Sequence, residues 1–511
     1  MKAHLHEYLH EAEGEYLGID HFPPRVSQGP RICQLVRSAS KWSHGTETEH
    51  SIVNAYITLI RQATHFIYIE NQFFITSTGT GESPITNTIG AAIVERVVRA
   101  AQSGQKFHII VVIPAIPGFA GDLKADSSLG TRAIMKFQYD SINRGGHSIM
   151  EEIRKAGYEP LDYIRFYNLR NYDRINTSSV MRDAEAQSGV NYEAARRDFD
   201  DRMGGYQGGA EQRVYGQPEN QDYNKYQRAA ENINARGGLG NTRWDSVAEC
   251  YMLNGPDIRG VPWETGLTAE IDAFVSEELY VHTKVMIVDD RIVVCGSANL
   301  NDRSQLGYHD SEIAMVIEDS EHIDSYMDGR QYRASKFAAS LRRQLMRKHL
   351  GLIFPQTINR PDQNFMPPGS TNEYDFGSAE DDLVADPLAP GFLNFWNGRA
   401  NSNTAAFSKV FHAIPDDRVR SWKDYEDYFE KYFHDAEGVV DGKKPSTDAR
   451  NQWGHVVKQE FSSGPEGAQE VKNVLSTIKG SLVEMPLQFL INEDIAQIGL
   501  TLNAFTEEVY T

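Results

Sequence analysis

The feature that most constrains the fold is an order of elements that occurs twice: an amphipathic helix, then a short apolar run. Apolar residues at Ile52, Tyr56 and Leu59 have helical spacing, and HFIYIENQFFI then has the β-branched and aromatic character of a strand. GAAIVERVVRAAQSG likewise predicts a helix that ends at Gly104, before the buried strand FHIIVVIPAIPG. The sequence therefore predicts layers of an α/β fold.

A second region, FVSEELYVHTKVMIVDDRIVVCGSANL, contains two strand-like runs. They meet at Asp289 and Asp290, whose short acidic side chains can satisfy the backbone groups of a turn. The pattern predicts a β-hairpin.

A helix is predicted after this hairpin. One face is marked by the apolar residues Phe337, Leu341, Leu345 and Leu352. Another face carries the cations Arg342, Arg343, Arg347 and Lys348. The stretch 330–348 could bind anions at a membrane surface, although packing and solvation are the default explanation for such a helix.

Changes of composition divide the chain. We predict a polar, loop-like lead-in at 1–45, an α/β unit at 46–354, a linker rich in Pro, Asp and Gly at 355–390, and an extension at 391–511. Within the α/β unit, residues from about 174 to 243 are rich in Gln, Asn and Gly and have no persistent period, which predicts a mobile insertion.

The formal net charge of -20 opposes non-specific attraction to nucleic acid or an anionic bilayer, so we expect no nucleic-acid partner. Three cysteines are too few for a disulfide framework or a zinc cluster, which favours a cytoplasmic protein. Neither a signal peptide nor a membrane span is evident, so any membrane contact is expected to be peripheral.

The candidate chemistry lies in the predicted hairpin. His282 and Lys284 are two residues apart, which on a strand places both side chains on one face. Ser297 and Asn299 follow the second run and add polar groups. Histidine can attack phosphorus or protonate a leaving oxygen, while lysine and asparagine stabilise phosphate oxygens, without a metal or another cofactor. Glu312 is the candidate that orients the imidazole.

These segments resemble the phospholipase D superfamily. HTKVMIVDD followed by GSANLNDRS is similar to its HxKxxxxD and GSxN motifs, with five residues in register: His282, Lys284, Asp289, Ser297 and Asn299. YIENQFFI resembles the segment that marks eukaryotic phosphatidylcholine-hydrolysing members. VVIPAIPGFAGDL, KFQYDSINRGGHSI, FSKVFHAIPDD and the terminal EEVYT extend the resemblance over most of the chain outside the insertion.

The resemblance implies an α/β/α sandwich lobe, with a mixed sheet flanked by helices and a C-terminal extension packed on it. It also implies two lobes that share one site and supply one histidine each. Of the 16 histidines here, only His282 has lysine two positions later. We therefore expect this chain to be the second lobe, with 1–45 as the end of a missing first lobe.

The resemblance also suggests roles for the remaining polar residues. Asp289 belongs to the motif, but its offset from Lys284 turns it away from the catalytic face, so we interpret it as structural support. Glu70, Asn71 and Gln72 either line the site as substrate-binding groups or brace it.

The implied function is hydrolysis of phosphatidylcholine to phosphatidic acid and choline, and transphosphatidylation, through a phosphohistidine. Two alternatives stay open. One is a symmetric homodimer in which two copies of His282 meet, as in single-motif phosphodiesterases. The other is an inactive, truncated product that binds phospholipid.

A basic stretch near YIENQFFI is associated with phosphoinositide binding in the eukaryotic enzymes. Arg96, Arg99 and Lys106 occupy the similar position, which makes a phosphoinositide activator an expectation. The alternative, which we prefer, is the solvated face of an amphipathic helix.

Overall fold

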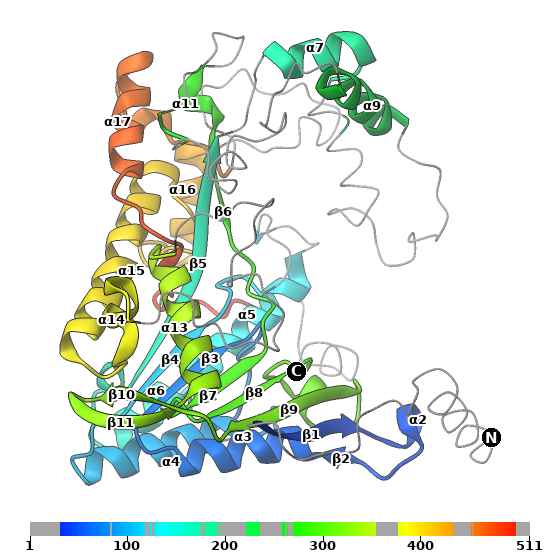
Figure 1. The fold of residues 1–511 in the computed structure, drawn as a ribbon. Helices are drawn as coiled ribbons and strands as arrows, with labels where there is room; N and C mark the ends of the chain where they lie inside the picture. The colour runs from blue at the N-terminus through cyan, green and yellow to red at the C-terminus, as the bar shows by residue number, and fades with distance from the viewer. Residues whose placement is uncertain are drawn as a thin grey trace.

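A computed structural model gives the fold of the chain (Figure 1). It describes residues 31–81, 84–117, 123–124, 128–174, 179–191, 195, 221–235, 258–260, 263, 269–353, 377–433, 451 and 453–496.

One large mixed sheet organises the described part of the chain. Its ten strands are β1 (Arg31–Ala39), β2 (Glu49–His50), β3 (Phe66–Glu70), β4 (His108–Val112), β5 (Ile164–Arg174), β6 (Phe274–Glu278), β7 (Val285–Val288), β8 (Ile292–Gly296), β9 (Glu312–Asp319) and β12 (Leu482–Glu484). The order is β12-β5-β4-β3-β7-β8-β9-β1-β2, and β6 pairs with β5 off this path. β3, β4 and β5 are parallel, whereas β7, β8, β9 and β1 pair antiparallel.

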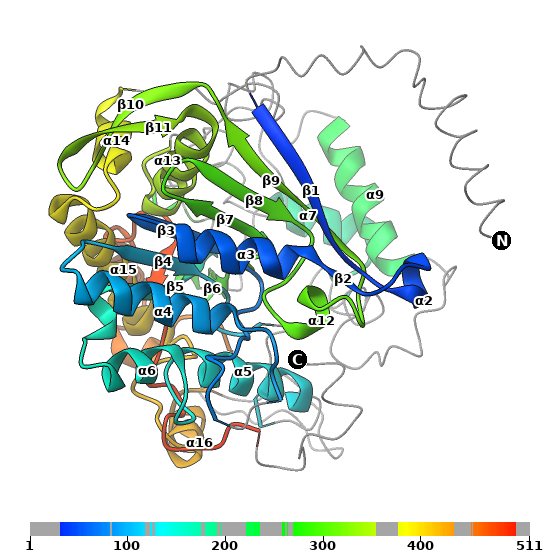
Figure 2. The same cartoon turned by 90° about the horizontal axis from the view of Figure 1, so that it is seen from below.

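Helices cover both faces of the sheet (Figure 2). One face carries α3 (Ser51–Gln62), α4 (Ile89–Gln102), α5 (Leu129–Ile142) and α6 (Ile149–Lys155). The other carries α13 (Lys336–Leu350), α14 (Ala379–Ala385) and α15 (Pro390–Phe411). Alternate residues of β3 serve the two cores: Ile67 packs with the first group, and Phe66 and Tyr68 pack with the second. The predicted α/β fold is confirmed, including the helix-then-strand order and the β7–β8 hairpin.

Smaller elements complete the description. They are α2 (Lys41–His44), η4 (Pro160–Asp162), α7 (Ser179–Ser188), α9 (Gln221–Ala235), α11 (Glu270–Ala273), α12 (Asp302–Gln305), α16 (Trp422–Tyr432), η7 (Lys458–Glu460), α17 (Pro465–Leu475) and the hairpin of β10 (His322–Met327) with β11 (Arg330–Ser335). Among the described residues, no helix is long and apolar enough to cross a bilayer.

The lead-in contributes a strand to the sheet. β1 pairs with β9 along eight residues, from Arg31 opposite Asp319 to Ser38 opposite Glu312. The prediction of a loop is therefore wrong for residues 31–39, because the strand's partner lies far along the sequence and could not be recognised locally. The preceding residues lie outside the described part.

The C-terminal extension also joins the sheet, through β12, which pairs with β5. The approach to β12 touches the end of α13, where the Ser481 amide donates to the main-chain oxygen of His349 at 3.0 Å. Gly351 and Gly480 both have positive φ, 71° and 65°. A Cβ on Gly480 would lie 2.1 Å from that same oxygen, so only glycine fits.

Two helices lie within the predicted insertion. α7 and α9 pack on each other through a small core that includes Ala184, Tyr226 and Ala230. The sequence pattern does not predict these helices, because alanine and tyrosine at helical spacing are sparse within a Gln- and Asn-rich composition. Most of the rest of the insertion, and residues 355–376 of the predicted linker, lie outside the described residues.

Candidate functional site

The turn of the β7–β8 hairpin is built by two aspartates in the left-handed region, Asp289 at φ 52° and Asp290 at φ 50°. The Asp289 carboxylate accepts from the main-chain amides of Thr64 (2.7 Å), His65 (2.7 Å) and Phe66 (2.8 Å), and from the Thr64 hydroxyl (2.8 Å). Asp289 therefore fixes the start of β3. It lies at the opposite end of β7 from Lys284, which agrees with a structural interpretation.

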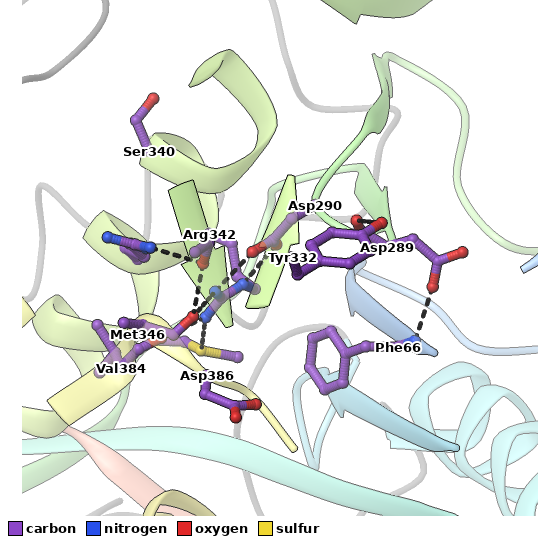
Figure 3. Close-up of polar contacts among 12 residues, drawn as sticks. Phe66, Asp289, Asp290, Tyr332, Ser340, Arg342, Met346, Val384 and Asp386 are labelled. Carbon is purple, nitrogen blue, oxygen red and sulfur yellow. Dashed lines mark hydrogen bonds and ion pairs between the residues drawn. The ribbon is translucent and has the colours of Figure 1, made fainter. Parts of the chain in front are cut away.

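Asp290 is fully buried and pairs with Arg342 of α13 (Figure 3). The guanidinium donates to both carboxylate oxygens, at 2.6 and 2.7 Å, and to the main-chain oxygens of Val384 at 2.7 Å and Ala385 at 3.0 Å. This pair ties the hairpin turn to α13 and to the end of α14.

The other arginines of α13 are also buried. Arg343 pairs with the buried carboxylate of Asp381 at 2.7 Å, and the side chain of Arg347 is 1% exposed. The possibility that residues 330–348 form an anion-binding surface is therefore wrong for Arg342, Arg343 and Arg347. Their charges are buried against carboxylates and carbonyls inside the fold.

The catalytic candidates precede β7, which begins at Val285, so the predicted strand position for them is wrong. His282 is exposed, whereas Lys284 is 9% exposed. Lys284 Nζ donates to Gln72 Oε1 at 3.0 Å and to the main-chain oxygen of His282 at 2.8 Å. The ring of His282 stacks on that of Tyr280, with centroids 6.2 Å apart. The imidazole of His282 is therefore accessible to a ligand, whereas the ammonium of Lys284 is held in place by its two hydrogen bonds.

The electrostatics of the site favour an uncharged histidine beside a cation. Burial and the neighbouring charge of Lys284 lower the pKa of His282 below its ordinary 6.5. Burial lowers the pKa of Lys284 to about 8, although the charge of Glu312 partly opposes this shift. A neutral imidazole is the form that can act as a nucleophile.

The second half of the motif lies between β8 and β9. Ser297 donates a hydrogen bond to Glu312, and no hydrogen bond joins Glu312 to His282 among the described residues. Asn299 follows β8, and its buried side-chain oxygen has no hydrogen-bond partner among the described residues.

The end of β3 joins these segments through two consecutive side chains. Asn71 accepts from the amide of Leu300, directly after Asn299, at 3.1 Å. Gln72 accepts from Lys284 and donates to the hydroxyl of Tyr280 at 2.7 Å. Of the two roles left open for Asn71 and Gln72, these contacts favour bracing the site over lining it.

Glu70 forms a buried pair with His349, a residue that the sequence analysis did not select. Its carboxylate lies 2.7 Å from His349 Nε2 and accepts from the Tyr68 hydroxyl at 2.6 Å. Burial raises the pKa of Glu70, but the charge and hydrogen bond of His349, with hydrogen bonds from Tyr68 and Thr283, outweigh this effect and lower it below 4.5. Thr283 lies between His282 and Lys284, so its hydrogen bond to Glu70 connects the buried Glu70–His349 pair to the catalytic segment.

The proposed phosphoinositide residues do not form a free basic patch. Arg96 is 1% exposed and donates to the main-chain oxygens of Ala63 at 2.5 Å and Thr64 at 3.0 Å. The expectation that Arg96 binds phosphoinositide is therefore wrong, because this guanidinium donates to main-chain oxygens at the end of α3. Arg99 contacts Glu95, and Lys106 pairs with Asp328 at 2.7 Å.

One known protein family matches the part of the chain that contains this site. The model of a family described as Phospholipase D matches residues 33–200 and 268–366, together more than half of the chain. The chain belongs to the phospholipase D family. The matched ranges contain both the end of β3 and the His282–Lys284 segment.

Individual relatives agree. Phospholipase D zeta 1 of Arabidopsis thaliana is 30% identical over 482 residues, 92% of this chain and 32% of that protein. Phospholipase D1 of Schizosaccharomyces pombe is 35% identical over 321 residues, 62% of this chain and 17% of that protein. The chain thus spans about a third or less of these relatives. A solved structure, NucT from Helicobacter pylori, is 11% identical to this chain, and the alignment covers 57% of this chain and 87% of NucT with a TM-score of 0.22.

Proposed function

We propose that this protein is a phospholipase D that hydrolyses phosphatidylcholine to phosphatidic acid and choline at a membrane surface. The observation that carries the proposal is the gathering of His282, Lys284 and Asn299 by the end of β3. An open imidazole beside a held ammonium suits attack at a phosphodiester. Membership of the phospholipase D family favours this reaction over other phosphoryl transfers.

The reaction needs two histidines. One attacks phosphorus and forms a phosphatidyl-histidine while choline leaves with a proton from the other; water then attacks the intermediate and releases phosphatidic acid. His282 supplies one of the two positions, and Lys284 and Asn299 stabilise the non-bridging oxygens. We propose that a first-motif lobe supplies the second histidine, since the sequence has a single HxK pair.

Two substitutions test the assignment in this chain combined with the N-terminal half of a related enzyme. His282→Asn should abolish phosphatidic acid formation, and Lys284→Ala should reduce kcat about 100-fold or more, as expected for a lost charge contact in an active site. Lys225→Ala, at a distant exposed residue of α9, is the matched control. Near-normal turnover by His282→Asn would contradict the proposal.

A covalent intermediate makes a second prediction about the products. A primary alcohol should capture the phosphatidyl group in place of water, so dilute butanol should yield phosphatidylbutanol. Exclusive formation of phosphatidic acid at every alcohol concentration would favour direct attack by water.

The chain expressed alone separates the alternatives. We expect little or no turnover, because one histidine cannot readily act as both nucleophile and leaving-group acid from one position. Sedimentation measurements accompany the choline-release assay. Robust turnover by a monomer would contradict the two-lobe reaction, and turnover by a dimer would support the symmetric arrangement.

A further inference from the structure

Tyr280 closes a ring of contacts around the catalytic pair. Its hydroxyl accepts from Gln72 Nε2 at 2.7 Å, and the other end of that amide accepts from Lys284 Nζ at 3.0 Å. Lys284 also donates to the main-chain oxygen of His282 at 2.8 Å, and the ring of His282 stacks on Tyr280. These contacts link two segments that are more than 200 residues apart in the sequence.

The amide of Gln72 has to present its oxygen to the ammonium. Lysine has three donors and no acceptor, so an amide that turned its nitrogen toward Lys284 would lose this contact. The Tyr280 hydroxyl, which can accept a hydrogen bond, favours the observed orientation by binding the nitrogen end. The hydroxyl of Tyr280 therefore acts on Lys284 through Gln72.

The ring of Tyr280 acts on His282 directly. Among the described residues, no side chain forms a hydrogen bond with the imidazole, and the carboxylate of Glu312 accepts from Ser297. The two rings are inclined by 25°, within the range of offset stacking. Tyr280 is thus the contact that restricts the plane of an otherwise open imidazole, while 43% of its own surface stays exposed.

We propose that Tyr280 is a positioning residue that couples the orientation of His282 to that of Lys284. Its ring sets the plane of the imidazole, and its hydroxyl holds the amide that holds the ammonium. This proposal rests on the proposed phospholipase D function for its effect on turnover. The geometry of the coupling is testable without turnover.

Three variants separate the ring from the hydroxyl. Tyr280→Phe keeps the ring and removes the hydroxyl, Tyr280→Leu removes both, and Gln72→Leu removes the amide. In the chain combined with a first-motif lobe, Tyr280→Phe should lower kcat about three- to tenfold, as expected for one neutral hydrogen bond, with KM little changed. Tyr280→Leu should lower kcat further.

A double variant distinguishes positioning from a general loss of structure. Because the hydroxyl acts only through Gln72, Tyr280→Phe combined with Gln72→Leu should be no slower than Gln72→Leu alone. Multiplicative effects of the two substitutions would overturn the coupling. Tyr326→Phe, at an exposed tyrosine of β10, is the control for loss of a surface hydroxyl.

NMR of the His282 ring tests the same geometry in the isolated chain, with His282→Asn to assign the resonance. Tyr280→Phe should preserve the ring-current shift of His282, and Tyr280→Leu should remove it. An unchanged His282 resonance in Tyr280→Leu would overturn the proposal even if the enzyme is active. Absence of turnover when the unsubstituted chain is combined with a first-motif lobe would instead contradict the proposed function, and this NMR test would remain decisive for Tyr280.

Discussion

Glu70 and His349 are 279 residues apart in the sequence and form a buried pair beneath the catalytic segment, with both side chains 4% exposed. Replacing His349 with leucine leaves the Glu70 carboxylate buried without its imidazole partner. We expect this change to lower the free energy of unfolding by about 3 to 5 kcal/mol, measured by denaturant titration.

His349→Gln is the matched control, because its amide can still donate to Glu70, and it should cost less. The effect also has a pH dependence. The lowered pKa of Glu70 means that the pair stabilises the fold above the ordinary value of 4.5, and that this stability is lost as the pH falls through the lower folded value. An equal loss in both variants at every pH would contradict the role of the pair.

Asp289→Ala should destabilise the fold by about 2 to 4 kcal/mol. The substitution removes four hydrogen bonds to a charged acceptor and places alanine at a positive φ. Thermal and denaturant unfolding measure the loss, with Asp324→Ala at an exposed position of β10 as control. If Asp289 were catalytic instead, turnover per folded molecule would fall while the free energy of unfolding stayed unchanged.

Arg342 and Asp290 should depend on each other. Arg342→Met alone leaves a carboxylate buried without its cation, which costs about 3 to 5 kcal/mol. Adding Asp290→Asn, which tolerates the positive φ, should recover part of that loss. A double-mutant cycle in denaturant measures this coupling, and simple additivity of the two changes would contradict it.

The pH dependence of turnover should report on Lys284. Its ammonium form stabilises phosphate oxygens, so kcat/KM should fall as the pH rises through about 8. Glu312→Gln removes a charge that raises the pKa of Lys284, and the midpoint should therefore move to lower pH. Lys284→Arg, although slower, should lose this fall because arginine stays protonated. If the midpoint of the fall in kcat/KM stayed the same in both variants, the fall would have to be assigned to the titration of another group.

Local patterns account for what the sequence predicted correctly. The β7–β8 hairpin, the helices α3, α4 and α13, and the His282–Lys284 pair each depend on residues within about twenty positions, where periodicity and turn chemistry act. The structural role of Asp289 could also be predicted, from its position relative to Lys284. Its hydrogen-bond partners at residues 64–66 could not be identified from the sequence.

Long-range partnerships account for what was missed. Each of these partnerships joins residues that are more than 200 positions apart: Tyr280 with Gln72, Glu70 with His349, and strand β1 with strand β9. The arginines of α13 looked like a basic surface because their carboxylate partners, at Asp290 and Asp381, lie on other elements. A single sequence carries no signal for such pairings, and burial reverses the expectation for a charged side chain.

The contact between Gly351 and Gly480 sets a rule for chimaeric phospholipases built from this chain. The two backbones meet so closely that a side chain on Gly480 has no room, and β12 completes the sheet immediately beyond. A crossover placed anywhere between Gly351 and Gly480 divides this contact between two parents. Exchanging residues 336–351 and 480–484 together should preserve it, whereas exchanging either alone places an unmatched loop against the helix that carries His349.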